Sequence, residues 1–257
     1  MFIGIDIGNT DTVVALYNGK EWQYIWRTPS NRNNQPSDYG NFILEQFKNN
    51  KLEIKSITQI GLSSVVPVLT PIMQTALKMV FNKKVVTLGK DIYPKTGLKV
   101  VNPDKIGTDL VCNAMAAYHH FKTTCIAIDF GTALTVIAVS KTGEILGVAI
   151  APGIKTAMKA LALNAAQLPE IPLELPESAI GTNTIHAMQG GILWGYVGLV
   201  NGLIDRVSEE LNEPLKIAAT GGLSFLLTPL HERFDILDRQ LTLDGLRFIV
   251  EKVWENE

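Results

Sequence analysis

The sequence predicts an α/β fold made of two similar halves, and three observations support this. First, an apolar strand that ends in Asp-x-Gly-polar occurs twice, in residues 2–10 and again 123 positions later in residues 125–132. Second, each copy runs into another apolar strand, 12–17 or 134–140, which ends at a glycine-containing turn. Third, strand patterns alternate with helical patterns along the rest of the chain, as in proteins that layer helices on sheets.

After its opening hairpin, the first half alternates helices and strands up to a long loop and a further helix. Thr70-Pro71 indicates a helix start, because proline is favoured at the first helical position. Pro67 ends the strand before it, and the prolines and glycines that follow residue 91 indicate a loop. The expected elements are helix 37–47, strand 57–66, helix 70–81, strand 84–88, loop 91–108 and helix 110–121.

The second half repeats this plan. Pro152-Gly153 separates the three opening strands from a helix, and Asn183 or Thr184 caps a long helix that ends near residue 211. The repeat divides the chain into an N-terminal domain, 1–117, and a C-terminal domain, 118–257. The expected elements of the second half are strands 125–129, 134–140 and 145–151, helix 154–165, loop 168–176, helix 184–211, strands 216–220 and 234–237, and helix 243–254.

The composition is that of a globular protein with a full core: 257 residues, 46% hydrophobic and 19% charged, with a net charge of −2. This balance argues against a nucleic-acid partner or an anionic membrane surface. Cys112 and Cys125 lie in apolar patterns, which favours buried free thiols over a disulfide. Free thiols fit a reducing compartment, and the sequence opens on a strand pattern in place of a signal peptide. Together these features predict a cytoplasmic protein. Residues 187–204 carry no charge over 18 positions, but their polar and glycine residues favour a buried helix over a membrane span.

Asp6-Ile7-Gly8-Asn9-Thr10 is the strongest chemical signal. An aspartate at a strand end can hold Mg²⁺ through water, because this ion keeps several waters and takes few protein carboxylates. Gly8 lets the backbone approach a phosphate, and the amides of the turn can donate to phosphate oxygens. The alternative is a turn that only closes a hairpin. The second copy of the motif argues against that alternative, because a chance turn would not recur with the same flanking strands.

Three further features each allow two interpretations. Gly221-Gly222 offers a flat surface for a base or ribose, or forms a plain strand-to-helix turn. Asp109 caps a helix, which is worth about 1 kcal/mol, or accepts a proton from a substrate hydroxyl during phosphoryl transfer. The third feature is a set of glycines in the long helix, which permits packing on its own sheet or a subunit interface. These glycines are Gly191, Gly195, Gly198 and Gly202.

Other common site patterns are absent from the sequence. It contains no Gly-x-x-x-x-Gly-Lys-Ser/Thr, which excludes a P-loop enzyme. Its four histidines and two cysteines do not show the spacing of metal ligands.

Taken in order, these segments resemble those of the type III pantothenate kinases, a branch of the acetate and sugar kinase, Hsp70 and actin superfamily. The resemblance implies two ribonuclease-H-like domains of the actin-like ATPase fold, with a nucleotide cleft between them, and a homodimer. It implies ATP-dependent phosphorylation of pantothenate to 4'-phosphopantothenate, the first step of coenzyme A biosynthesis. It rests on residues 6–10, 63–67, 102–109, 129–133, 151–153, 180–184, 188–192, 219–223 and 241–246.

The resemblance also implies roles for single residues. Asp109 would be the base that activates the pantothenate hydroxyl, and Asp129 would bind a monovalent cation, K⁺ or NH₄⁺. Asp6 would hold Mg²⁺ through water. The residues expected to bind ATP, including the glycine pair, are Asp6, Ile7, Gly8, Asn9, Thr10, Asp11, Thr12, Val13, Thr132, Gly221 and Gly222. Those expected to bind the acyl substrate are Gly107, Thr108, Asp109, Leu110 and Thr184.

The acid-binding half of the expected site departs from the family pattern. The family reads Gly-Ala-Asp-Arg where this chain has Gly107-Thr108-Asp109-Leu110, so the arginine for the pantothenate carboxylate is missing. Residues 98–101 lack the family's tyrosine, and Thr182 replaces a basic residue. Losing the charge-assisted hydrogen bond of that arginine costs about 1.5–3 kcal/mol. Lys105, Lys155 or a cation from a second subunit could offset this loss. Two alternatives follow: a kinase for another small hydroxyl compound, or a nucleotide-binding regulator that has lost catalysis.

Overall fold

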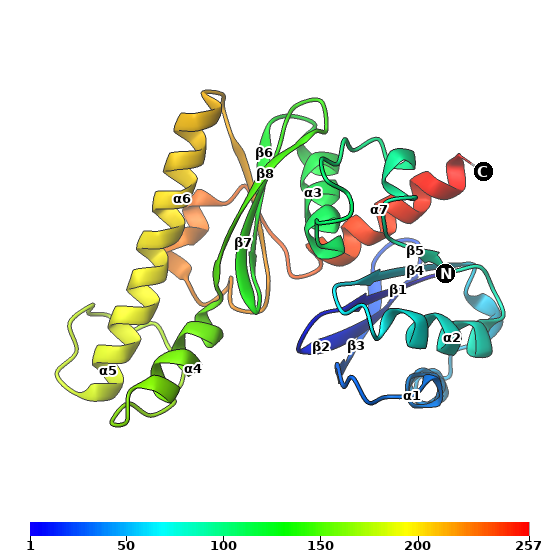
Figure 1. Ribbon diagram of the computed structural model, residues 1–257, viewed down its shortest axis with the longest axis horizontal. Coiled ribbons are helices and arrows are strands. Elements are labelled where there is room, and N and C mark those ends of the chain that lie inside the picture. The colour runs from blue at the N-terminus through cyan, green and yellow to red at the C-terminus, as the bar shows by residue number, and fades with distance from the viewer. Residues whose placement is uncertain (257) are drawn as a thin grey trace. The chain divides into compact units, whose positions relative to one another are not determined.

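The computed structural model describes residues 1–256, and its chain divides into two compact units (Figure 1). The first unit comprises Met1–Ala116 and Thr242–Glu257, and the second comprises Ala117–Leu241. The C-terminal segment therefore packs with the first unit, although it follows the second half of the chain.

The sheet of the first unit has five strands in the order β3-β2-β1-β4-β5. The first three strands in the chain are antiparallel neighbours, whereas β4 runs parallel to β1 and β5 parallel to β4. The carboxyl ends of β1, β4 and β5 therefore meet at one edge of the sheet. The strands are β1 (Phe2–Ile7), β2 (Asp11–Tyr17), β3 (Trp22–Pro29), β4 (Gln59–Ser64) and β5 (Val86–Thr87).

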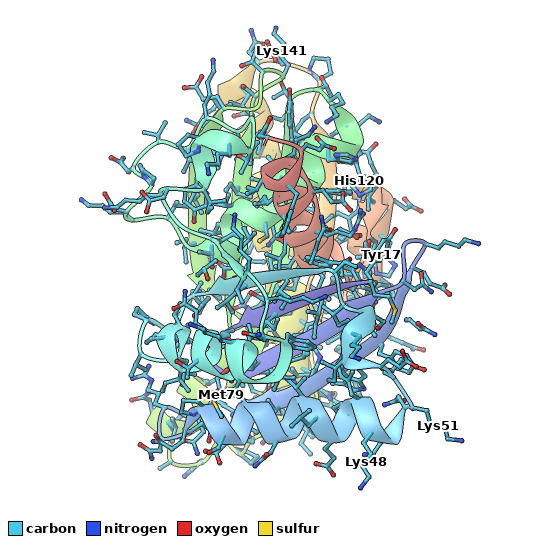
Figure 2. All side chains as sticks on the ribbon, turned by 90° about the vertical axis from the view of Figure 1, so that its right-hand side faces the viewer. Tyr17, Lys48, Lys51, Met79, His120 and Lys141 are labelled. Atoms are coloured by element: carbon cyan, nitrogen blue, oxygen red, sulfur yellow. The ribbon has the colours of Figure 1, made fainter. Side chains whose placement is uncertain are left out.

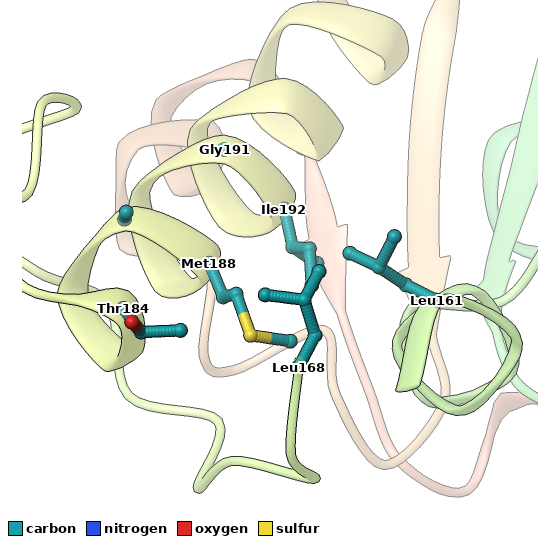
Figure 3. Close-up of a pocket in the computed structure, with 7 residues that line it drawn as sticks. Leu161, Leu168, Thr184, Met188, Gly191 and Ile192 are labelled. Atoms are coloured by element: carbon teal, nitrogen blue, oxygen red, sulfur yellow. The ribbon is translucent and has the colours of Figure 1, made fainter. Parts of the chain in front are cut away.

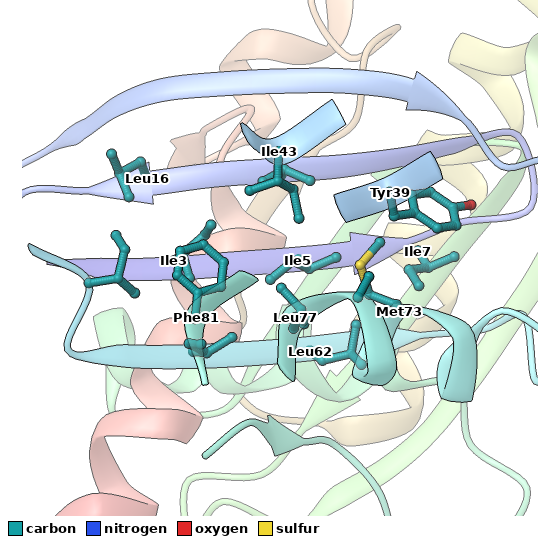
Figure 4. Packing of buried hydrophobic residues seen from close by; sticks show 14 of the residues in the cluster. Ile3, Ile5, Ile7, Leu16, Tyr39, Ile43, Leu62, Met73, Leu77 and Phe81 are labelled. Carbon is teal, nitrogen blue, oxygen red and sulfur yellow. The ribbon is translucent and has the colours of Figure 1, made fainter. Parts of the chain in front are cut away.

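Alternation along β1 sends its residues to two different faces of this sheet. Ile3, Ile5 and Ile7 are fully buried against α1 (Pro36–Asn49) and α2 (Thr70–Phe81), as Figure 4 shows. On the outer side of these helices, Lys48 points from α1 away from the sheet (Figure 2). The apolar side of the strand thus forms the core, which leaves Asp6 on the opposite face.

The opposite face of the first sheet is covered in part by α7 (Leu241–Glu255), through Leu243 packed on Val13 and Ala15. The remaining helix, α3 (Thr108–Phe121), begins in the first unit and runs into the second. Short 3₁₀ turns at Ile54–Ser56 and Tyr93–Lys95 complete the first unit. The face that carries Asp6 thus lies beside helices rather than in the main core.

The sheet of the second unit has the order β10-β9-β6-β7-β8. This is the order of the first sheet with each strand replaced by its counterpart from the second half, and the parallel and antiparallel pairs correspond as well. The duplication predicted from the repeated motif is therefore confirmed. The strands are β6 (Cys125–Phe130), β7 (Ala133–Val139), β8 (Ile145–Pro152), β9 (Lys216–Thr220) and β10 (Ile236–Leu237).

The helices of the second unit differ from the sequence prediction in two respects, one of which is the additional 3₁₀ segment Thr228–Arg233. The single long helix expected over 184–211 is three consecutive segments, because a π-helical turn interrupts it. Elsewhere the expected elements are present, with ends shifted by a few residues. The helical segments are α4 (Ile154–Asn164), α5 (Thr184–Gln189), the π-helical turn Gly190–Trp194, α6 (Gly195–Leu211) and the 3₁₀ segment Thr228–Arg233.

Two sequence predictions concern membrane insertion and the state of the cysteine thiols. Over residues 1–256, no helix is long and apolar enough to cross a bilayer. Cys112 and Cys125 are both buried free cysteines, as predicted.

Candidate active site

A cluster of polar residues lies where β1 and β4 end in the first unit. Asp6 of β1 is paired in register with Ser63 of β4, so their side chains stand on the same face of the sheet. The Ser63 hydroxyl donates a hydrogen bond of 2.8 Å to Oδ1 of Asp6. This bond fixes one carboxylate oxygen of the aspartate at the strand end.

A hydrogen-bonded chain continues from Ser63 to the first residue of α3. The hydroxyls of Ser63 and Thr108 are 2.9 Å apart, and Oγ1 of Thr108 accepts the backbone N–H of Ser64 at 2.9 Å. Since Ser63 donates to Asp6, the Thr108 hydroxyl is left to donate to Ser63. Ser63 and Thr108 are both buried. These hydrogen bonds therefore connect the start of α3 to the end of β1.

Asp109 follows Thr108 in the first turn of α3. Its Oδ1 accepts the backbone N–H of Leu110 at 2.8 Å. The carboxylate folds back over Gly107, where a Cβ would overlap Oδ1. Asp109 is thus the second residue of the helix and not its cap, because its bond goes to the N–H of the next residue. Its charge acts on Asp6. Leu110 itself is only 8% exposed, so its side chain belongs to the core.

Electrostatics in this cluster favour a bound cation. The pKa of Asp6 is raised to about 6, mainly by burial and in addition by the charge of Asp109, while the Ser63 hydrogen bond and the charge of Arg27 act in the opposite direction. Burial also raises the pKa of Asp109, against its backbone hydrogen bonds. Two carboxylates whose charged forms are disfavoured gain stability from a positive ion or a proton.

The turn after β1 exposes its backbone. The N–H of Gly8 donates to the carbonyl of Asp11 at 3.0 Å, which closes the turn. Asn9 and Thr10 at its tip are exposed, whereas Thr12 is buried and its hydroxyl lies 2.9 Å from that of Ser30. The tip of the turn is therefore accessible, and its base is anchored in the sheet.

The second copy of the motif lies in the second unit, where Asp129 is on β6. Gly221 has φ +95°, and a Cβ there would come within 2.6 Å of Oδ1 of Asp129. The Thr132 carbonyl accepts bonds from the Gly153 N–H at 3.0 Å and the Thr156 hydroxyl at 2.7 Å. Within this unit the structure thus brings Asp129 and the first glycine of the predicted pair into contact.

Thr184 begins α5, and its neighbour Asn183 caps this helix through a 3.0 Å bond from the His186 N–H. Thr184 lines a largely apolar pocket of about 580 Å³ in the second unit (Figure 3). The other lining residues are Leu161, Leu168, Ala187, Met188, Gly191 and Ile192.

Within residues 1–256, no group of three or more His, Cys, Asp or Glu side chains has the arrangement of a metal cage. Mg²⁺ needs no such cage, because it is commonly held by one or two carboxylates, waters and substrate phosphates. The half-buried Asp6, with its raised pKa and its single hydroxyl donor, fits an ion held in this way.

Two residues of this cluster received no role from the sequence. Ser63 lies in segment 63–67, which carries the family resemblance, but the sequence does not predict its role, because its bond to Asp6 depends on strand register across 57 positions. Arg27 lies on β3, a strand that the sequence pattern did not predict.

The buried bond chain gives a prediction for Thr108. Thr108→Val keeps the side-chain volume, but it leaves the Ser64 N–H without its acceptor and removes the bond between the hydroxyls of Ser63 and Thr108. Such a loss costs about 1–3 kcal/mol, so the free energy of unfolding, measured at equilibrium, should fall by this amount. Thr108→Ser should retain most of the stability. Thr75→Val is the control, because its exposed hydroxyl bonds only the Pro71 carbonyl of its own helix. If Thr108→Val and Thr75→Val both changed the free energy of unfolding only slightly and equally, the hydrogen bonds of Thr108 would have no structural role.

Comparisons with known proteins agree on one family. A family model described as type III pantothenate kinase matches residues 2–206. A protein of Geotalea daltonii named type III pantothenate kinase is 37% identical over 254 residues, which is 98% of this chain and 98% of the relative. A protein of Myxococcus xanthus with the same name is 37% identical over 251 residues, 97% of each chain.

Solved structures resemble the fold at low sequence identity. A conserved putative Baf family transcriptional activator from Campylobacter jejuni has a TM-score of 0.59 at 18% identity and covers 98% of this chain and 99% of its own. A ROK hexokinase from Thermus thermophilus has a TM-score of 0.52 at 12% identity, with 100% and 99% covered. A putative 2-dehydro-3-deoxygalactonokinase from Sinorhizobium meliloti has a TM-score of 0.58 at 10% identity, with 99% and 97% covered. At these identities the likeness concerns the fold alone, that of actin-like ATPases and sugar kinases.

Proposed function

We propose a mechanism on one premise: the chain belongs to the type III pantothenate kinase family. Its reaction is the ATP-dependent phosphorylation of pantothenate, which opens coenzyme A biosynthesis. The family match along nearly the whole chain carries this conclusion, together with Asp109 beside the Asp6 cluster. Neither a different acceptor nor a regulator without catalysis receives support from the relatives.

Asp109 acts as the general base in this proposal. Its carboxylate accepts the proton of the primary hydroxyl of pantothenate as the hydroxyl oxygen bonds to the terminal phosphorus of ATP and ADP leaves. The raised pKa of Asp109 suits this role, because a base works best when its pKa approaches the working pH. Since phosphoryl transfer depends on positioning and charge neutralisation, the bonds around Asp109 serve to orient the acceptor.

Asp6 and the following turn hold the phosphates. The exposed turn donates backbone N–H groups to phosphate oxygens, and Asp6 would hold Mg²⁺ through water. When bound, this ion neutralises charge on the transferring phosphate. Gly8 through Val13 complete this part of the site, with Thr12 and Val13 anchoring it in the sheet.

In the second unit, Asp129 binds the monovalent cation, K⁺ or NH₄⁺. Thr132 contacts ATP, and Gly221 and Gly222 present a side-chain-free surface to its nucleoside. Thr184 contacts the acyl substrate from the start of α5. We further propose a cytoplasmic homodimer, which the glycines of α6 and the exposed Leu199 on the same helix support.

A substrate panel tests the function. Purified protein with ATP, Mg²⁺ and K⁺ is assayed for ADP release on pantothenate and on small alcohols and sugars. We expect turnover of pantothenate and rescue of a bacterial strain that lacks its own pantothenate kinase. Turnover of another alcohol in place of pantothenate, without rescue, would refute the assignment of the acceptor.

A further inference from the structure

A row of four residues crosses the sheet of the first unit at the position of Asp6. Arg27 of β3 pairs with Val13 of β2, Val13 pairs with Asp6 of β1, and Asp6 pairs with Ser63 of β4. Residues paired across neighbouring strands project to the same face of a sheet. Arg27 and Asp6 therefore stand on one face, with only Val13 between them.

The span between Arg27 and Asp6 suits a long side chain. Neighbouring strands lie about 4.8 Å apart, so the two backbones are about 10 Å apart. Val13 is only 8% exposed, because Leu243 of α7 packs on it, whereas Arg27 is exposed. The charge of Arg27 acts on the carboxyl group of Asp6, whose pKa it lowers. The guanidinium thus contributes a positive charge to the face that carries the Asp6 cluster.

Arg27, like Arg32 and Arg239, forms none of the ion pairs of residues 1–256, in contrast to three other arginines. Arg206, Arg233 and Arg247 each form ion pairs with carboxylates within 4.0 Å. Among the ion pairs of residues 1–256, none includes Arg27. Its guanidinium is therefore available to an anion.

We propose that Arg27 binds the terminal phosphate of ATP and stabilises the charge that develops on it during transfer. This inference rests on the proposed function. The planar guanidinium matches a phosphate with two parallel hydrogen bonds. Positive groups aimed at a transferring phosphoryl group lower the barrier most where water is partly excluded. Arg27 shares its row with Asp6, the residue from which the turn after β1 continues, so we assign it the phosphate rather than the pantothenate carboxylate.

A simpler role for Arg27 is protection of the sheet edge. β3 is an edge strand, and charged side chains on such strands discourage pairing with other chains. Lysine would serve that purpose as well as arginine. The two roles therefore predict different results for Arg27→Lys, which keeps the charge but loses the bidentate geometry.

The test measures nucleotide affinity and turnover in the full-length protein. Isothermal titration calorimetry compares a non-hydrolysable ATP analogue with ADP in the wild type, Arg27→Gln, Arg27→Lys and the control Lys20→Gln. Lys20 is an exposed cation in the turn between β2 and β3. We expect Arg27→Gln to lower the affinity for the analogue about tenfold. The affinity for ADP should stay the same, because ADP lacks the terminal phosphate. Turnover should fall about 10²–10³-fold, while Lys20→Gln matches the wild type.

Two further measurements separate this role from a structural one. Added guanidinium should restore part of the turnover of Arg27→Ala, and Arg27→Lys should remain well below the wild type. Three results would each overturn the proposal. They are an equal loss of affinity for the analogue and for ADP, wild-type turnover by Arg27→Lys, and a change confined to a higher KM for pantothenate. If the wild type fails to phosphorylate pantothenate but binds the analogue through Arg27, the acceptor assignment fails while this inference stands.

Discussion

Asp109→Asn is expected to abolish measurable phosphorylation of pantothenate while leaving ATP binding intact. A general base contributes about 10²–10⁴ in rate, and asparagine cannot accept the hydroxyl proton. The amide oxygen still accepts the Leu110 N–H, so the start of α3 is preserved. Turnover is followed by ADP release at saturating pantothenate, and nucleotide affinity by calorimetry.

Asp104→Asn is the matched control for this variant. Asp104 lies in the loop before α3, its side chain is 70% exposed, and it pairs with Lys90 at 3.0 Å. An exposed ion pair contributes at most about 1 kcal/mol, so turnover should stay near the wild-type value. If Asp109→Asn turned over pantothenate as fast as Asp104→Asn, Asp109 would not be the base, and its bond at the helix start would be its main role.

The parts of the fold that the sequence predicts are those with local signals. β1 and β6 are continuous apolar runs that end in the same motif, so their pattern identifies them. β3 escapes prediction because it is an edge strand whose side chains are partly exposed, without a clear alternation of buried residues. The π-helical turn at Gly190–Trp194 escapes because it changes backbone hydrogen bonds without breaking the apolar pattern.

The same distinction applies to the candidate site. Asp6, Asp109 and Asp129 belong to short motifs, so the sequence indicates them as site residues. The bond from Ser63 to Asp6 and the position of Arg27 depend on which strands become neighbours. Such contacts arise from tertiary register, which a motif of five residues does not contain.

Gly245→Ala is expected to destabilise the first unit strongly, although alanine favours helices. Gly245 lies inside α7, where alanine would normally add about 1 kcal/mol of stability. A Cβ at this position would overlap the backbone carbonyl of Cys112 in α3. Backbone atoms cannot rotate away, so the two helices must separate. That movement would strain the 2.8 Å bond from Thr242 to Asn113 and the packing of the fully buried Leu246.

Gly40→Ala tests the opposite sign in the same unit. Gly40 lies inside α1, and a Cβ there would meet a methyl group of Val80 at 3.6 Å, an ordinary contact. We expect Gly40→Ala to raise the free energy of unfolding by about 0.5–1 kcal/mol, and Gly245→Ala to lower it by about 3 kcal/mol. Chemical denaturation of both variants measures the difference. A similar gain for both glycines would mean that α7 shifts freely against α3, and that α7 does not hold the helix carrying Asp109 in place.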